Sequence, residues 1–120
     1  MIRGIRGATT VSTNASAEII DNTQALVEEM AEANSIRPES IATVLISVTA
    51  DIDADFPAKA LRNIEGWKYV PVMCMKEIDV PGSLEKCIRV MMTVNCEQAQ
   101  QDVKHIYHQE AVKLRPDLLR

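Results

Sequence analysis

The chain is 120 residues long, with 47% hydrophobic residues, 25% charged residues and a formal net charge of −4. One domain spanning residues 1–120 is expected, because a chain of this length cannot support two independent cores. The acidic balance argues against nucleic acids and acidic membranes as partners, since both require a basic face. An anionic small molecule can still bind where a few cations converge.

The cysteine pattern and the amino terminus bear on the cellular compartment. The cysteines are Cys74, Cys87 and Cys96, an odd number without C-x-x-C spacing, which argues against a disulfide framework and favours a reducing compartment. Residues 1–10 lack the continuous apolar segment of a signal peptide, and no apolar run reaches the length of a membrane span. A cytoplasmic protein is therefore expected.

The first part of the chain predicts a strand followed by a long helix. Residues 2–11 are rich in β-branched side chains, and Gly4 and Gly7 within them indicate a bulge or a close backbone approach. Asn14 is expected to be the N-cap, because its side chain can accept a hydrogen bond from a free backbone N–H. Apolar residues then recur at helical spacing, which predicts an amphipathic helix over residues 15–33.

The middle of the chain predicts two more strands and two short helical segments. Pro38 is expected to begin a helical turn, and Pro57 a short helix. Residues 43–49 (TVLISVT) form an apolar, β-branched run that is typical of a buried strand. Residues 69–75 predict a third strand, which Pro71 places at an edge or beside a bulge.

The last part of the chain contains the clearest strand pattern. Residues 87–94 alternate in polarity, which should place Ile88 and its even-numbered neighbours on one face and Cys87 and Arg89 on the other. A short helix is expected over residues 98–103 and a short strand over 105–107. The whole predicts a mixed α/β (α+β) domain with four or five strands, one long helix and several short helices.

Arg89 is the strongest single candidate for a functional residue. Its strand neighbours are apolar on both faces, so the guanidinium is expected to be partly buried and paired with a carboxylate. That carboxylate can belong to the protein or to a ligand, and both readings remain open. Arg6, beside Gly7, is a second candidate cation, although the sequence alone favours an ordinary edge-strand arginine.

The sequence does not predict a metal or cofactor site. His105 and His108 are three residues apart, but no second ligand pair accompanies them. The chain also lacks a phosphate-binding lysine motif and a glycine-rich dinucleotide motif. Taken alone, these features indicate an anion-binding site that contains arginine.

Five segments, taken together, resemble the small monofunctional chorismate mutases that form trimeric pseudo-α/β barrels: GIRGATTV, FPAKALR, GWKYVPVMCMKEIDV, KCIRVMMTV and AVKLRPDL. The resemblance runs in order across nearly the whole chain. It is weakest over residues 12–42, where mainly the helical pattern agrees. It implies a homotrimer with active sites between subunits, chorismate as substrate, and no cofactor or metal.

The resemblance also implies roles for individual residues. Arg6 matches an arginine that binds a substrate carboxylate, and Arg89 matches one that hydrogen-bonds the ether oxygen and an adjacent carboxylate. Glu77 matches an acid that accepts a hydrogen bond from the ring hydroxyl, and Cys74 matches the thiol beside it. Tyr107 matches a tyrosine whose hydroxyl meets a carboxylate.

Further matched positions line the pocket or its mouth: Phe56, Ala58, Lys59 and Arg62. Leu114 and Arg115 match a tail segment that covers the pocket. Met73 departs from the family pattern, since relatives often carry threonine there, and a minor polar contact is lost or replaced by its backbone.

The chemistry of chorismate rearrangement agrees with this residue set. The reaction is a concerted pericyclic shift to prephenate, a step in the synthesis of phenylalanine and tyrosine, and it requires no nucleophile or proton shuttle. The enzyme can hold the substrate in a chair-like geometry and place a fixed positive charge beside the ether oxygen as the C–O bond breaks. Two alternatives stay open: an imine/enamine deaminase on the same trimeric fold, and a non-catalytic module that binds a metabolite.

Overall fold

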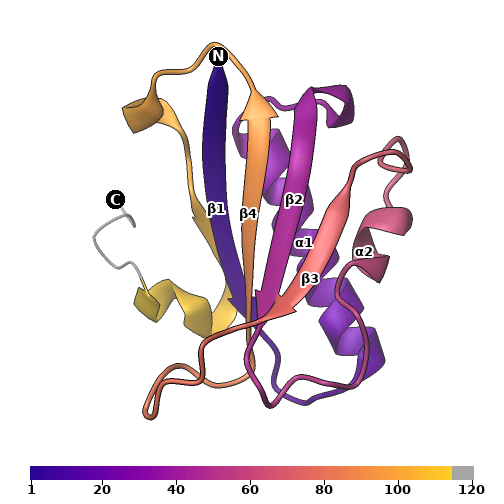
Figure 1. Ribbon diagram of the computed structural model, residues 1–120, viewed down its shortest axis with the longest axis vertical. Helices are drawn as coiled ribbons and strands as arrows, with labels where there is room; N and C mark the ends of the chain where they lie inside the picture. The colour runs from indigo at the N-terminus through magenta and orange to yellow at the C-terminus, as the bar shows by residue number, and fades with distance from the viewer. Residues whose placement is uncertain (115–120) are drawn as a thin grey trace.

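The computed structural model describes residues 1–114, in which five strands form one mixed sheet in the order β3-β2-β4-β1-β5 (Figure 1). The strands are β1 (Ile2–Thr10), β2 (Ile41–Val48), β3 (Val72–Lys76), β4 (Cys87–Asn95) and β5 (Ile106–Tyr107). The helices are α1 (Ser16–Ala33) and α2 (Lys59–Arg62), with 3₁₀ turns η1 (Pro38–Ser40), η2 (Gln100–Asp102) and η3 (Gln109–Leu114). The predicted fold class, with one long helix and several short ones, is confirmed.

The long antiparallel strands occupy the middle of the sheet, and short parallel strands flank them. β4 pairs antiparallel with both β1 and β2, whereas β3 pairs parallel with β2 and β5 pairs parallel with β1. β3 is an edge strand, as Pro71 predicted. It begins at Val72 rather than at Tyr69, because the chain still turns there and the Val70 N–H donates to the Trp67 carbonyl.

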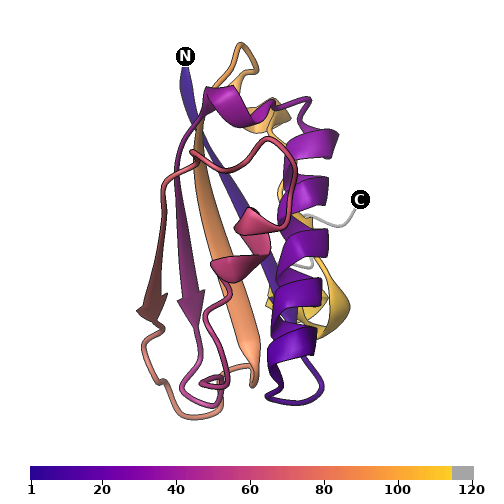
Figure 2. The ribbon, with the colours of Figure 1, turned by 90° about the vertical axis from the view of Figure 1, so that its right-hand side faces the viewer.

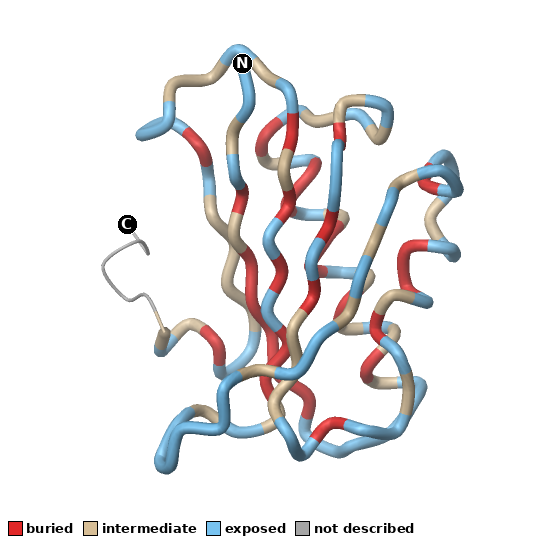
Figure 3. Tube along the Cα trace, viewed as in Figure 1, coloured by how far each residue is buried: buried red, intermediate tan, exposed pale blue. Residues whose placement is uncertain are grey.

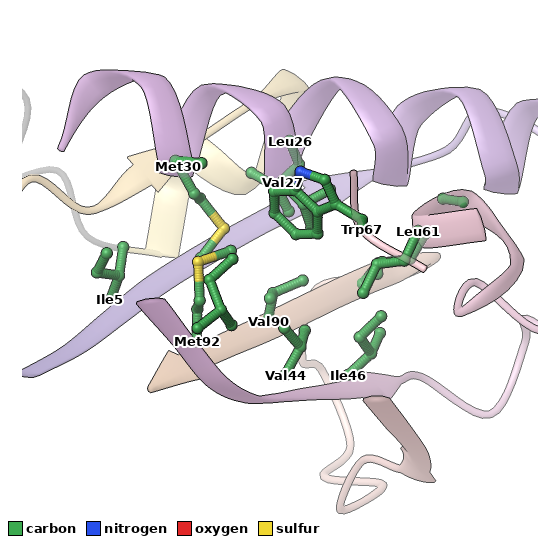
Figure 4. Close-up of a cluster of buried hydrophobic side chains, with 14 of the residues drawn as sticks. Ile5, Leu26, Val27, Met30, Val44, Ile46, Leu61, Trp67, Val90 and Met92 are labelled. Carbon is green, nitrogen blue, oxygen red and sulfur yellow. The ribbon is translucent and has the colours of Figure 1, made fainter. Parts of the chain in front are cut away.

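The core lies between α1 and one face of the sheet. Figure 2 shows α1 and α2 on the same side of the sheet. Met30 of α1 and Met92 of β4 are fully buried and point toward one another, with Leu26 and Trp67 nearby (Figure 4). Burial alternates along β4, as the sequence predicted (Figure 3).

The other face of the sheet is the open face, and it carries a different set of side chains. In β1 and β2 they are Arg6, Ala8, Thr43, Leu45 and Ser47, and in β3 and β4 they are Met73, Met75, Cys87, Arg89, Met91 and Thr93. Four large apolar members are exposed to between 39% and 63%: Leu45, Met73, Met75 and Met91. The prediction that residues 43–49 form a buried strand is therefore wrong for one of its two faces. Of the described helices, none is long and apolar enough to cross a membrane.

The predicted helix cap is wrong, although the predicted helix is confirmed. Ala15 occupies the N-cap position of α1 and makes no side-chain cap. Asn14 instead bonds a distant loop: its amide donates to Asp53 Oδ1 at 2.7 Å, and its oxygen accepts from the backbone N–H groups of Asp53 and Ala54. Three hydrogen bonds to that loop replace the single one that a cap would offer.

Glu18 satisfies the residues before the helix and makes the stability of the protein sensitive to acid. Its carboxylate accepts the backbone N–H groups of Ser12 and Thr13 and both hydroxyls. The Ser12 backbone bond is the main cause that lowers the pKa of Glu18 from 4.5 to about 2. Because the folded-state pKa lies below the unfolded one, the ionised Glu18 stabilises the protein above the unfolded pKa. This stabilisation is lost as the pH falls toward 2.

We therefore expect Glu18→Gln to lower the urea midpoint at pH 6, and the difference from wild type to shrink as the pH falls from 5 to 2. Urea unfolding followed by circular dichroism at several pH values would measure this. A difference that stays constant over that range would contradict the assignment.

The predicted close approach at a strand glycine is confirmed at Gly7. A Cβ at this position would lie 2.4 Å from Met30 Sδ, and Met30 is fully buried.

We expect Gly7→Ala to lower the free energy of unfolding by about 1–3 kcal/mol, as overpacking does in dense cores. In a Met30→Val background, which lacks the δ atom, the loss should be smaller. Urea denaturation of the four proteins would test this, and strictly additive effects would exclude the contact as the cause.

Candidate active site

The open face brings together two predicted site residues around Ala8. Ala8 of β1 pairs with Arg89 of β4 on one side and with Tyr107 of β5 on the other. Directly paired residues in a sheet point to the same side, so Arg89 and Tyr107 flank the small Ala8 side chain. Arg6 lies two residues earlier in β1 and shares this face. The strand register thus gathers three of the predicted site residues.

These side chains line a cavity of about 380 Å³ on the open face. Its polar lining includes Arg6, Arg89, Tyr107 and Ser47, and its apolar lining includes Leu45, Met75, Met91 and Leu114. Leu114 comes from η3, which also places the buried Ala111 against Ala8. The cavity therefore combines two cations and a phenol with an apolar floor, as a site for an anionic organic molecule would.

The Arg6 backbone is held by a side chain at the start of β5. The Arg6 N–H donates to His105 Nδ1 at 2.9 Å, one residue before the β1–β5 pairing begins at Gly7 and Ile106. The imidazole thus extends the ladder of a very short strand. In this arrangement the Nδ1 atom of His105 carries no proton, since it accepts the hydrogen bond.

Glu77 supplies the carboxylate that was expected near Arg89. Arg89 Nε lies 3.4 Å from Glu77 Oε2, and the Ser47 hydroxyl donates to the same oxygen at 3.0 Å. The Glu77 N–H donates to the Val48 carbonyl at 2.8 Å, which anchors the residue just beyond the end of β3. The pairing with a carboxylate is confirmed, and the Arg89 side chain is 48% exposed, which agrees with the partly buried setting that was expected.

Cys74 and Phe56 lie around a second cavity rather than beside Arg89. That cavity measures about 600 Å³ and lies between the loop after β2 and β3. Cys74 faces the helix side of the sheet, opposite to Met73 and Met75. Burial raises the pKa of the Cys74 thiol, and a backbone hydrogen bond from Ala58 partly offsets this effect.

The remaining predicted residues belong to α2, to the edge strand and to the tail. Lys59 Nζ lies 2.8 Å from Asp55 Oδ1, an interaction that, with the Ser16 hydroxyl, lowers the pKa of Asp55 to about 2. Arg62 is exposed on the same helix, and Met73 is 63% exposed on β3. Arg115 lies outside the described residues. Within one chain, the α2 cations do not line the cavity that contains Arg6 and Arg89.

Several side chains around this cavity were not singled out from the sequence. Ser47, Leu45, Met75 and Met91 line it, and Ser47 contacts Glu77 directly. Strand alternation along residues 43–49 would have placed Leu45 and Ser47 on one face. The continuous apolar run instead led to the prediction of a strand buried on both faces. Among residues 1–114, no three His, Cys, Asp or Glu side chains are grouped as metal ligands would be.

Comparisons with known proteins identify the family of the chain. Residues 2–118 match the family model of chorismate mutase type I. The chain is 52% identical over 118 residues to chorismate mutase AroH of Bacillus subtilis strain 168, covering 98% of this chain and 93% of that protein. It is 45% identical over 119 residues to chorismate mutase AroH of Thermus thermophilus, covering 98% and 97% of the two chains.

A solved structure gives the same answer for the fold. The chorismate mutase from Clostridium thermocellum superposes with a TM-score of 0.87 at 55% identity, over 90% of this chain and 96% of that one. The fold and the sequence matches together define an isomerase of the chorismate mutase class. The chain belongs to the type I chorismate mutase family, an isomerase family, as its sequence predicted.

Proposed function

We propose that the chain converts chorismate to prephenate in the cavity of the open face, without a covalent intermediate. The observation that carries this proposal is the convergence of Arg6, Arg89 and Tyr107 on one cavity in a protein of net charge −4. Chorismate is a dianion, so two cations can bind its carboxylates while the apolar floor contacts the ring. The family match favours this reaction over the deaminase and the non-catalytic binding module.

Arg89 supplies the main electrostatic contribution in this mechanism. As the C–O bond breaks, partial negative charge grows on the ether oxygen, and a fixed guanidinium stabilises it more in the transition state than in the ground state. Arginine suits this role because it stays charged and offers a rigid fork of donors. The Glu77 carboxylate pairs with Arg89 Nε. The ring hydroxyl of the substrate donates a hydrogen bond to the same carboxylate.

Arg6 and Tyr107 fix the orientation of the substrate. Both lie on the open face next to Ala8, with Tyr107 opposite Ala8 in β5 and Arg6 two residues earlier in β1, so they can bind carboxylate groups that flank the breaking bond. Holding both carboxylates favours the compact, chair-like conformer over the extended forms that dominate in water. This contribution is conformational and adds to that of Arg89.

We also propose that the protein is a homotrimer with active sites between subunits. The exposed apolar side chains of the open face support this, since contiguous apolar surface of this kind usually marks an interface. A neighbouring copy would bring its α2 region and the adjoining end of β3 to this cavity: Phe56, Ala58, Lys59 and Arg62 with Cys74. A cytoplasmic location is part of the proposal, and it agrees with three cysteines that are all free thiols.

The direct test mixes purified protein with chorismate and follows the loss of its ultraviolet absorbance. Acid conversion of the product to phenylpyruvate identifies prephenate. Prompt conversion that persists in a chelator supports the proposal. No conversion by a folded protein would contradict it, and tight chorismate binding without product would indicate the binding module instead.

A further inference from the structure

Ser47 occupies a place in the site that neither the sequence nor the family match singled out. It lies in β2 directly opposite Arg89 in the β2–β4 pairing, and it lines the same cavity. Its hydroxyl donates to Glu77 Oε2 at 3.0 Å, the oxygen that also faces Arg89 Nε at 3.4 Å. One carboxylate oxygen is therefore shared by a neutral donor and a charged one.

The other contacts of Glu77 come from the backbone. Its Oε1 accepts the Ile78 N–H at 3.1 Å, and its own N–H donates to the Val48 carbonyl. Among the described residues, Ser47 is the only neutral side chain that hydrogen-bonds this carboxylate. It is thus the contact that can be removed without changing any charge in the site.

The geometry suggests what this contact prevents. A carboxylate and a guanidinium that meet freely tend to form a short, bidentate pair, which occupies two donors of the arginine. Here the two groups meet through Glu77 Oε2 and Arg89 Nε at 3.4 Å, and the Ser47 hydroxyl of β2 hydrogen-bonds the same oxygen at 3.0 Å. Because Arg89 is 48% exposed, its own packing would not stop the guanidinium from turning toward Glu77.

We propose that Ser47 is a positioning residue, which holds Glu77 in place so that Arg89 directs its terminal amines at the substrate and Glu77 keeps a lone pair for the ring hydroxyl. This inference rests on the proposed roles of Arg89 and Glu77. It assigns to Ser47 no contact with the reacting atoms. Its effect should therefore appear in the transition state more than in substrate binding.

The test measures kcat and KM for Ser47→Ala and Ser47→Thr. We expect Ser47→Ala to lower kcat by about 10- to 100-fold, the range for one hydrogen bond to a charged group, with a smaller change in KM. Ser47→Thr keeps the hydroxyl and should recover most of the activity. Thr43→Ala is the matched control: it removes a hydroxyl from the same strand and the same face, outside the cavity, and should leave kcat unchanged.

Glu77→Gln separates failure of the inference from failure of the proposed function. In the Glu77→Gln background, Ser47→Ala should cause little further loss, because both changes act on one interaction. If Glu77→Gln is impaired but Ser47→Ala has the kcat of wild type, the inference is wrong and the function stands. If Glu77→Gln itself has normal turnover, the role of Glu77 is wrong and the inference falls with it. A loss that threonine does not restore, accompanied by a lower melting temperature, would show that Ser47 is merely structural and overturn the inference.

Discussion

Arg89→Ala should lower kcat by on the order of 10²–10³, the usual cost of removing one donor that stabilises charge developing in a transition state. The change leaves the substrate carboxylates with Arg6 and Tyr107, so KM should rise less than kcat falls. Stopped or continuous absorbance assays with chorismate would separate the two parameters. A folded Arg89→Ala protein with near-normal turnover would show that the charge beside the ether oxygen comes from elsewhere.

Two companion variants make the Arg89 result specific. Arg89→Lys keeps the positive charge but loses the planar fork and the Nε that faces Glu77, so it should recover only part of the activity. Arg37→Ala removes an exposed arginine far along the chain, just before η1, and should behave as wild type. The fold should survive Arg89→Ala, because a half-exposed ion pair contributes only about 0–1 kcal/mol.

The fold was predictable wherever one physical signal dominated. The helix over α1 and the two faces of β4 follow from apolar spacing, because each has one side against the core and one side away from it. β2 misled for the opposite reason. Because Leu45 is apolar, the sequence pattern predicted burial on both faces of this strand. In the structure Leu45 is 40% exposed, since the described chain covers only one face of the strand.

The site was predictable in its residue types but not in its contacts. A strand arginine among apolar neighbours implied a carboxylate partner, yet nothing local indicated Glu77, which is 12 positions away and belongs to a different strand end. The Ser47 hydrogen bond spans 30 positions and depends on the β2–β3 register. Asn14 failed as a cap for the same reason, since a loop 39 positions away offered more bonds. Long-range polar pairing follows from the tertiary structure, and local sequence rules do not contain it.

The separation of the predicted site residues within one chain leads to a test with a large expected effect. Arg89 lies on the cavity of the open face, whereas Lys59 and Arg62 extend from α2 and do not line it. If each active site joins the two regions from neighbouring subunits, the double variant Lys59→Ala/Arg62→Ala should lose about 100-fold or more in kcat/KM, as expected for two charged contacts to a dianion. Arg89→Ala should also be nearly inactive by itself.

Mixing these two inactive proteins should then restore activity. When equal amounts are unfolded together and refolded as trimers, a given interface pairs an intact Arg89 half with an intact α2 half in about one quarter of cases, so about one quarter of wild-type activity should return. The same proteins mixed without unfolding give the control for slow subunit exchange, and refolding each alone gives the background. Recovery at this level would require the two regions to act across a subunit boundary, because no single chain in the mixture contains both. Absence of recovery from correctly assembled mixed trimers would place all the essential groups of a site on one subunit. The α2 cations would then act on the cavity of their own chain, which would require a rearrangement of the loop over residues 49–58.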